Sequence, residues 1–513
     1  MIFKKFLFFF FFIAFSSILI FAEYQDKNFK QDNGKAFPEN EYVAVIDTHK
    51  ISAEEFFFGY EYGPAFVKRS KNSKDQYLNY MINEKLMSLD GYSKGIDTTE
   101  QAVSMVNEFK NDLATEELFK QDILAKIEIN EDEINAAINK KQLDLNIKWL
   151  FADSETSTNN LLKQMKNGVS FDSLFKEQLN DSVLIDERSM EIDRFKLEQQ
   201  NPALASIIDS LTAGKISLPI KIDDGWYIVK LENMTKNMIA SESEYQRLKQ
   251  EAVNAVTKNK MDVESDKYVN NLMIKRNPII KRNTFNLLAS YLAGYVLPSE
   301  KFVDWKISEK LNSALKNLNS SSKNDYSNGV LVKTKNSEIK LKEFIVWFRN
   351  RSEYIKFNKK DFQNFSTSLE ALVWRMVCDN LLSEEAHERG LDKLDSVVKQ
   401  LGWWKDKIVS SIVKNEIANS VLLNEKEIKS GGKEKESTKN SEDLSDEFSK
   451  KLLKKILSLK KKYHVTINEQ VLNEIKVSDE NDPKAIDFFT VKRGGLIPRT
   501  PYPTIDYDWI NWE

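Results

Sequence analysis

The sequence predicts an α+β protein that is mostly helical, with a small α/β domain between helical modules. Three observations predict this class. Apolar residues recur at helical spacing over most of the 513 residues. Strand-like alternation is concentrated in residues 143–233. Landmarks of the first helical region recur, in the same order, after residue 331.

The chain begins with a segment typical of export. Lys4 and Lys5 precede an unbroken apolar run from Phe6 to Ala22, which is the layout of a secretory signal. A run of this length is at the short edge of what spans a bilayer, and Ile20 stands where cleavage prefers a small residue. Two interpretations therefore stay open: residues 1–22 are a cleaved signal peptide, or residues 6–22 are a retained inner-membrane anchor. Either way we predict an exported protein of the periplasm or cell envelope.

Composition excludes several classes of function. Lys and Arg number 75 against 78 Asp and Glu, for a net charge of −3, whereas a nucleic-acid surface needs a basic excess. Cys378 is the single cysteine, so no internal disulfide can form, and its apolar helical surroundings predict a packing role. The three scattered histidines make a poor metal site. We therefore expect no metal, cofactor or nucleotide.

The N-terminal module is expected to be helical after a short strand at 42–46. Ser52 is a candidate helix N-cap, with Glu55 at capping-box spacing. Two helices are expected at 75–92 and 99–127, with Gly95 ending the first.

The segment 143–233 has a different pattern of apolar residues, with strand-like alternation. Residues 145–151 alternate as a strand, and helices are expected at 157–167, from the cap Ser170 onward, and at 202–212. Two further strands, 216–222 and 226–231, flank an Asp-Asp-Gly turn.

After residue 331 the layout of the first module recurs. Ile339–Phe344 echoes Ile51–Phe56, Gly390-Leu391-Asp392 echoes Gly95-Ile96-Asp97, and 423–428 echoes 129–134. The echoes predict a duplicated helical module, unless they are chance similarity between amphipathic helices.

The rest of the chain connects or follows these modules. A charged helix is expected at 240–275, a Ser/Asn-rich loop at 312–328, a helix at 447–461 and a strand at 463–467. The aromatic tail is expected either to add as an edge strand to this protein or a partner, or to be disordered. The expected domains are a signal peptide or anchor (1–22), an N-terminal helical module (41–142), the α/β domain (143–233), a helical connector (234–328), a second helical module (329–428), a flexible linker (429–447) and a C-terminal helix, strand and tail (448–513).

Three stretches of the α/β segment carry a resemblance. They are Gly168-Val169-Ser170-Phe171-Asp172-Ser173-Leu174, Leu211-Thr212-Ala213-Gly214-Lys215-Ile216-Ser217-Leu218-Pro219-Ile220 and Asp224-Gly225-Trp226-Tyr227-Ile228-Val229-Lys230-Leu231. In order and spacing this segment resembles the parvulin (PpiC-like) family of peptidyl-prolyl isomerases. The helical regions on either side resemble those of SurA-type and PpiD-type exported chaperones. The resemblance implies a parvulin fold flanked by modules that hold unfolded polypeptides.

The departures from the family pattern concern its catalytic pocket. The family places a His on the first strand and another on the last. This chain has Trp149 or a direct neighbour of it at the first position and Tyr227 at the second. Leu204 stands where the family has a pocket Phe. Isomerisation crosses a barrier of ~18–20 kcal/mol, and a catalyst must bind the twisted amide better than the planar forms. The domain is therefore expected to be a scaffold or peptide-binding surface, with residual activity through the Tyr227 hydroxyl as the alternative.

We therefore predict an ATP-independent chaperone for unfolded or nascent exported proteins, outer-membrane proteins among them. The first and last modules are expected to pack together as an open cradle. An active prolyl isomerase and an envelope assembly subunit with one fixed partner remain as alternatives. The candidate client-binding residues are Phe171, Trp226, Trp403 and Trp404, although Trp403 and Trp404 also suit simple packing.

Overall fold

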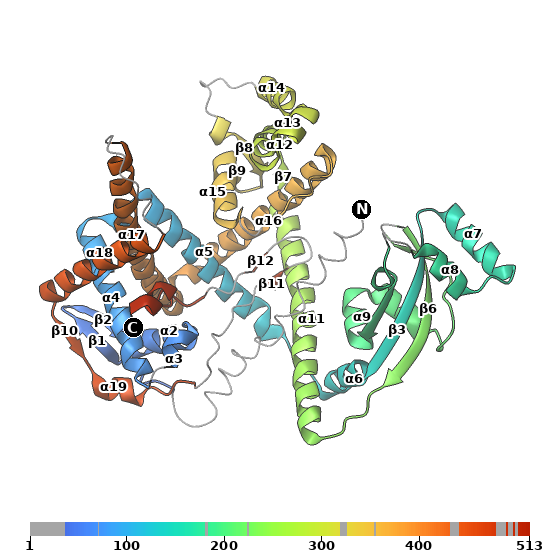
Figure 1. Ribbon diagram of the computed structural model, residues 1–513, viewed down its shortest axis with the longest axis horizontal. Coiled ribbons are helices and arrows are strands. Elements are labelled where there is room, and N and C mark those ends of the chain that lie inside the picture. Colours follow the sequence, from blue (N-terminus) through green and yellow to red (C-terminus); the bar gives the residue numbers. More distant parts are fainter. Residues whose placement is uncertain are drawn as a thin grey trace. The chain divides into compact units, whose positions relative to one another are not determined.

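The computed structural model is mostly helical with small sheets, which confirms the predicted fold class (Figure 1). It describes residues 36–69, 71–179, 183–222, 225–318, 326–352, 355–430, 441–478, 489–490, 496–497 and 501–512. The export segment 1–22 lies outside these residues. Within them, every helix is too short or too polar to cross a membrane. The chain forms two compact units, one of Ile127–Met261 and the other of the described residues before and after it.

The first unit is built on a four-stranded antiparallel sheet of order β4-β3-β6-β5. Its strands are β3 (Leu143–Ala152), β4 (Ser189–Asp193), β5 (Ile220–Ile222) and β6 (Gly225–Lys236). The helices around it are α6 (Glu131–Lys141), α7 (Glu155–Lys166), α8 (Phe171–Gln178), α9 (Arg194–Gln200) and α10 (Pro202–Asp209), with the 3-10 turn η5 (Ile185–Glu187). The unit also contains the first part of α11 (Glu242–Arg276).

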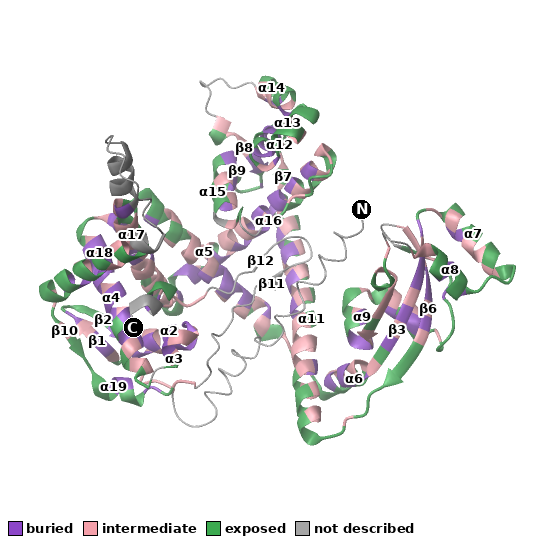
Figure 2. Ribbon diagram, viewed as in Figure 1, coloured by how far each residue is buried: buried purple, intermediate pink, exposed green. Residues whose placement is uncertain are grey.

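Alternation along β3 and β6 gives this sheet two apolar faces. Ile147 and Val229 belong to one cluster with residues of α9 and α10, whereas Leu150 and Ile228 belong to another with α8. Figure 2 shows the buried residues concentrated along these two central strands. Ser170 caps α8 as expected, because its Oγ accepts the Ser173 N–H at 3.1 Å.

The second unit contains two three-stranded sheets, β10-β1-β2 and β7-β8-β9, each followed by a helix. The first set comprises β1 (Tyr42–Ile46), β2 (His49–Ser52), α2 (Ala53–Glu61), α3 (Ala65–Lys68), α4 (Ser73–Ser93), η3 (Ile96–Thr98), α5 (Glu100–Asp122) and η4 (Leu124–Lys126). The second comprises η6 (Tyr326–Asn328), β8 (Val330–Lys333), β9 (Glu338–Lys340), α15 (Leu341–Arg351), α16 (Phe362–Glu388), η8 (Leu391–Lys393) and α17 (Asp395–Ser430). The remaining elements are β7 (Ile279–Ile280), α12 (Arg282–Val296), α13 (Ser299–Asp304), α14 (Ile307–Asn317), α18 (Ser441–Lys462), β10 (Val465–Ile467), α19 (Glu469–Glu474), β11 (Phe489–Thr490), β12 (Leu496–Ile497) and η9 (Tyr507–Trp512).

The two sets share the order of a hairpin, a helix, a long helix, a 3-10 turn and a second long helix, although the first also contains α3 and η4 and the second begins with η6. Gly95 and Gly390, 295 positions apart, both adopt the left-handed conformation, with φ of 71° and 72°. Each ends a long helix and starts a one-turn 3-10 helix before the next long helix. The hairpins also match, since β1–β2 and β8–β9 each carry a register shift at the start of the first strand.

The same offset of 295 relates side-chain contacts between the two sets. Lys110 pairs with Asp392 at 2.8 Å, and the equivalent Lys405 pairs with Asp97 at 2.9 Å. The equivalent rings of Phe109 and Trp404 stack on each other, with centroids 3.8 Å apart. A contact between equivalent residues lies on a symmetry axis. The two sets therefore pack as a pseudo-two-fold pair.

Packing between the first and last parts of the chain, which the sequence led us to expect, is confirmed. Strand β10 pairs antiparallel with β1, from Ala44 opposite Ile467 to Ile46 opposite Val465. Helix α4 packs against both α17 and α18, and all of these elements contribute to one hydrophobic core.

Several expectations about elements were wrong. Residues 423–428 continue α17, whereas 129–134 contain the Asn130 cap that begins α6; the later segment consists largely of helix-forming residues without a breaker. Residues 312–317 belong to α14, and α18 begins at Ser441, inside the segment expected to be a linker. At α2 only half of the capping box forms. Ser52 accepts the Glu55 N–H at 3.0 Å, but the Glu55 carboxylate lines a pocket instead.

Candidate polypeptide-binding sites

The three residues expected at the degenerate pocket lie together on one face of the first unit's sheet. Trp149, on β3, is part of the buried cluster beneath α9 and α10, and Tyr227 and Leu204 pack against that cluster. Trp149 is opposite Val229 in the ladder, two residues from Tyr227. Period-2 alternation therefore places both aromatic side chains on the same face.

The surroundings of Tyr227 are aromatic and cationic. Its ring meets the Phe151 ring edge-on, with centroids 5.3 Å apart. The Arg188 guanidinium lies 4.9 Å from the Phe151 centroid. Gly225 makes the close approach of the strands possible here, because a Cβ at this position would lie 2.4 Å from the Phe151 ring.

This face offers apolar surface and a phenol rather than imidazoles. His49, His387 and His464 all belong to the second unit, so none of them is a residue of the sheet. Tyr227 and Leu204 are half-buried, which leaves part of each available to a ligand. The face can therefore contact a proline ring and offer one hydroxyl.

Two of the expected client-binding residues lie elsewhere on this unit. Phe171, at the start of α8, packs on the opposite face of the sheet and is 7% exposed. Lys230 covers its ring at 5.7 Å and pairs with Asp172 at 2.9 Å. Trp226 is half-buried at the start of β6, opposite Ala152. These positions do not form a single site with Tyr227.

The other two expected client-binding residues, Trp403 and Trp404, lie on α17 beside the C-terminal tail. Trp404 stacks on Phe109 and donates its indole N–H to the Pro501 carbonyl at 2.8 Å. Trp403 lies 6.5 Å from the Tyr502 ring, centroid to centroid. Residues 501–506 form no strand, so the expectation that this part of the tail adds as an edge strand to this protein was wrong.

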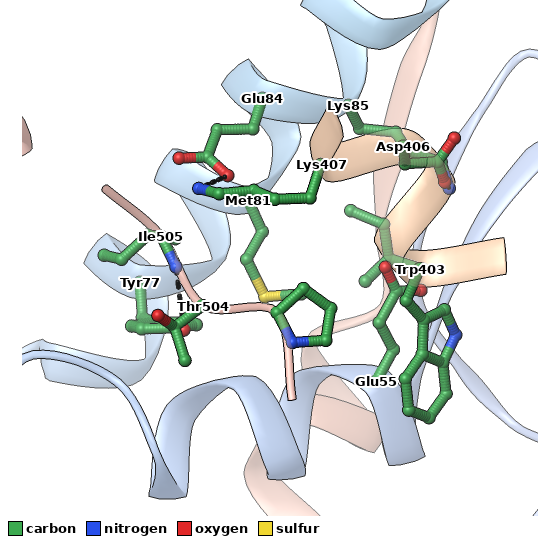
Figure 3. Close-up of a pocket in the computed structure, with 12 residues that line it drawn as sticks. Glu55, Tyr77, Met81, Glu84, Lys85, Trp403, Asp406, Lys407, Thr504 and Ile505 are labelled. Atoms are coloured by element: carbon green, nitrogen blue, oxygen red, sulfur yellow. Dashed lines mark hydrogen bonds and ion pairs between the residues drawn. The ribbon is translucent and has the colours of Figure 1, made fainter. Parts of the chain in front are cut away.

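A pocket of ≈ 40 Å³ beneath the tail contains several ionisable side chains (Figure 3). Lys85 pairs with Asp406, whose other oxygen accepts the Tyr92 hydroxyl at 2.6 Å. Burial raises the pKa of Glu55 to about 7, against the opposing effect of Lys85. For Lys85 burial lowers the pKa, but Glu55 and Asp406 outweigh it, so the pKa is raised.

A second cluster joins the tail to α4 and α17. Glu84 Oε2 contacts Lys407 Nζ at 2.7 Å, and Glu84 Oε1 accepts the Asp506 backbone N–H at 2.9 Å. The Asp506 carboxylate pairs with Lys407 at 2.8 Å and Lys414 at 2.6 Å. Burial opposes ionisation of Asp506, but these two cations outweigh it and lower its pKa. Sequence reasoning missed this cluster, because no motif connects α4, α17 and a tail more than 90 residues further on.

Two other ionisable groups have structural roles. Cys378 is buried on α16, and burial raises its thiol pKa to about 12. Glu133 closes the capping box of α6 and accepts from Lys260. Among the described residues, no group of His, Cys, Asp and Glu is arranged to hold a metal ion.

Comparison with known families identifies the domain. Residues 107–244 match the family model of the PPIC-type PPIASE domain. This confirms the resemblance of segment 143–233 to the parvulins, and the chain therefore contains a PPIC-type domain. A search of curated proteins finds no match to the chain.

Solved structures give distant likenesses. A peptidylprolyl isomerase, PrsA from Bacillus anthracis, is 16% identical; the match covers 37% of this chain and 96% of that one, with a TM-score of 0.22. PrsA from Bacillus cereus is 12% identical over 56% of this chain and 96% of its own, also at 0.22. A structure titled for PEB4 and Cj1289, two SurA-like chaperones of Campylobacter jejuni, is 13% identical over 46% and 97%, at 0.15. At these TM-scores we draw no conclusion from the likenesses.

Proposed function

We propose that this chain is an exported, ATP-independent folding chaperone whose parvulin-like domain binds unfolded polypeptides with little or no isomerase activity. It would act in the periplasm or cell envelope, either free or anchored through residues 6–22. Its clients would be unfolded or nascent exported chains, outer-membrane proteins among them. The match of residues 107–244 to the PPIC-type domain supports the class of ligand.

One observation carries the proposal of weak catalysis. Trp149, Leu204 and Tyr227 share one apolar face of the sheet, at the positions where the family has its pocket. Such a face can hold an apolar segment through buried area alone, at roughly 25 cal/mol per Å². Acceleration of isomerisation needs groups that bind the twisted amide better than the planar one, and a single phenol supplies little of that.

The proposal is tested with two assays on the same protein. Aggregation of a chemically unfolded client, followed by light scattering, measures holding. Refolding of a client whose slow step is prolyl isomerisation measures catalysis. We expect suppressed aggregation and little acceleration of refolding. Loss of holding in Leu204→Ala, whose side chain is only half-buried, with holding retained in the exposed-surface control Lys196→Ala, would assign the holding to this face.

An active isomerase, the alternative, predicts a different result in the refolding assay. If refolding is accelerated and the acceleration disappears in Tyr227→Phe, which removes only the hydroxyl, the scaffold interpretation is wrong. A third possibility, an assembly subunit with one fixed partner, predicts a single stoichiometric companion in pull-downs and no holding of general clients. Mass spectrometry of the mature N-terminus distinguishes cleavage after Ala22 from a retained anchor.

A further inference from the structure

The C-terminal tail, residues 501–509, is bound in an aromatic groove formed by α2, α4 and α17. At one end the Tyr502 ring stacks on Phe58, with centroids 4.2 Å apart and planes 9° apart. At the other end Trp509 stacks on Tyr80 at 5.3 Å and is 1% exposed. The tail therefore has an aromatic anchor at each end, which is how short peptides commonly obtain affinity.

Charged groups hold the middle of the tail. Asp506 pairs with Lys407 and Lys414, and Lys414 also pairs with Asp508 at 2.6 Å. Side chains of the groove also bind the tail backbone, since Glu84 accepts the Asp506 N–H and Trp404 donates to the Pro501 carbonyl. Glu84 additionally accepts the Trp509 indole N–H at 2.8 Å. The groove thus presents donors, acceptors and cations at fixed places along the tail.

Residues 501–506 belong to no helix or strand and are held by side chains of the groove, whereas Tyr507 begins the 3-10 helix η9 that carries Trp509. No described residue between 501 and 509 belongs to a strand of the sheets. The tail also leaves space unfilled, because an open cavity of ≈ 280 Å³ borders Tyr62, Trp404 and Tyr502. A segment held by side chains in an incompletely filled groove can be exchanged for another with the same pattern.

We propose that this groove is a binding site for polypeptide segments with an aromatic residue at each end and a carboxylate between them, and that the tail occupies it in cis. The proposal deepens the proposed chaperone function and rests on it. The tail then acts as a resident competitor. Because it is tethered, its effective concentration is high, and a free segment enters only when it binds well or when the tail is weakened.

The test uses the full chain and a fluorescently labelled peptide with the sequence of residues 501–512. Fluorescence anisotropy is measured with wild-type protein and with Trp509→Ala, whose own tail lacks one anchor. We expect the variant to bind the peptide about tenfold more tightly than wild type, because competition in cis is weaker. A control peptide with Asp506→Lys should bind the variant at least about tenfold more weakly, since it places a cation beside Lys407 and Lys414.

Several results would overturn the proposal. One is a folded Trp509→Ala protein that binds the peptide no better than wild type, and another is equal binding of the Asp506→Lys peptide. If Trp509→Ala does not fold, as judged by circular dichroism, Asp506→Ala replaces it, and failure of both to fold would make the tail a permanent part of the core. Aggregation suppression by wild type, together with no peptide binding by folded Trp509→Ala, would overturn the groove alone. Specific peptide binding without aggregation suppression would overturn the chaperone function alone.

Discussion

Replacing Glu55 by Gln should remove a pH-dependent decrease in the free energy of unfolding of the second unit. Glu55 lines the pocket with Lys85 and Asp406, and burial raises its pKa from 4.5 to about 7. Between these values the folded chain binds more protons at this group than the unfolded chain does. The free energy of unfolding therefore falls as pH rises through this window and loses nothing more above it.

The size of the Glu55 pKa shift determines the size of the change in unfolding free energy. Each pKa unit corresponds to 1.36 kcal/mol, so the full cost above pH 7 is on the order of 3 kcal/mol. Gln resembles the protonated acid and keeps the backbone N–H that Ser52 caps. The difference in unfolding free energy, Glu55→Gln minus wild type, should therefore increase by about 2 kcal/mol from pH 5 to pH 8.5. Asp112, whose pKa burial also raises to about 7, contributes equally to both proteins and cancels.

Urea unfolding at the two pH values measures this difference. The matched control is Glu54→Gln, one residue earlier on the same helix, where the side chain pairs with Lys399 at 3.6 Å on the surface. It should change stability by less than about 0.5 kcal/mol at either pH. An equal effect of Glu55→Gln at pH 5 and pH 8.5 would refute the assignment of a raised pKa to this carboxylate.

Two further predictions concern stability. Gly390→Ala should lower the free energy of unfolding by about 1–2 kcal/mol, because φ is 72° there. Gly402 lies inside α17 with no atom within 4 Å of a new Cβ, so Gly402→Ala should raise the free energy of unfolding by about 0.5–1 kcal/mol. Thermal melts of the two variants should therefore shift in opposite directions. Arg276 is buried and pairs with two glutamates of α16, so Arg276→Ala should lower the free energy of urea unfolding by about 3 kcal/mol. The control Arg247→Ala, in an exposed i,i+4 pair, should lower it by less than about 0.5 kcal/mol.

The helical modules were predictable where local sequence signals occur twice along the chain in the same order. Gly95 and Gly390 lie between two helical patterns in the same order, and only glycine readily adopts the left-handed turn required there. The parvulin-like unit was predictable because alternation on β3 and β6 and the Ser170 cap are properties of neighbouring residues. A helix or strand that is determined by one short run of neighbouring residues can therefore be predicted from the sequence alone.

The tail site was not predictable, for a physical reason. Glu84, Lys407 and Asp506 are ordinary surface-type residues in their own segments, and only the packing of α4 against α17 brings them together. Charged side chains on helices are usually solvated, so no local pattern distinguishes these three. The same holds for Glu55, whose spacing from Ser52 predicted a capping box, while tertiary packing directs its carboxylate into the pocket.

The offset of 295 positions also allows the charged residues of the tail groove to be compared with their equivalents in the other set. The offset that relates Gly95 to Gly390 relates Lys407 to Asp112 and Glu84 to Asp379. Lys407, on α17, pairs with the acidic tail, whereas its equivalent on α5, Asp112, is a carboxyl whose pKa burial raises to about 7 against the opposing effect of Arg351. The surroundings of the pseudo-axis are retained in both copies, since the Lys110–Asp392 and Lys405–Asp97 pairs are equivalent. The charged positions have therefore diverged between the two sets, while the ion pairs at the pseudo-axis that position the helices have not.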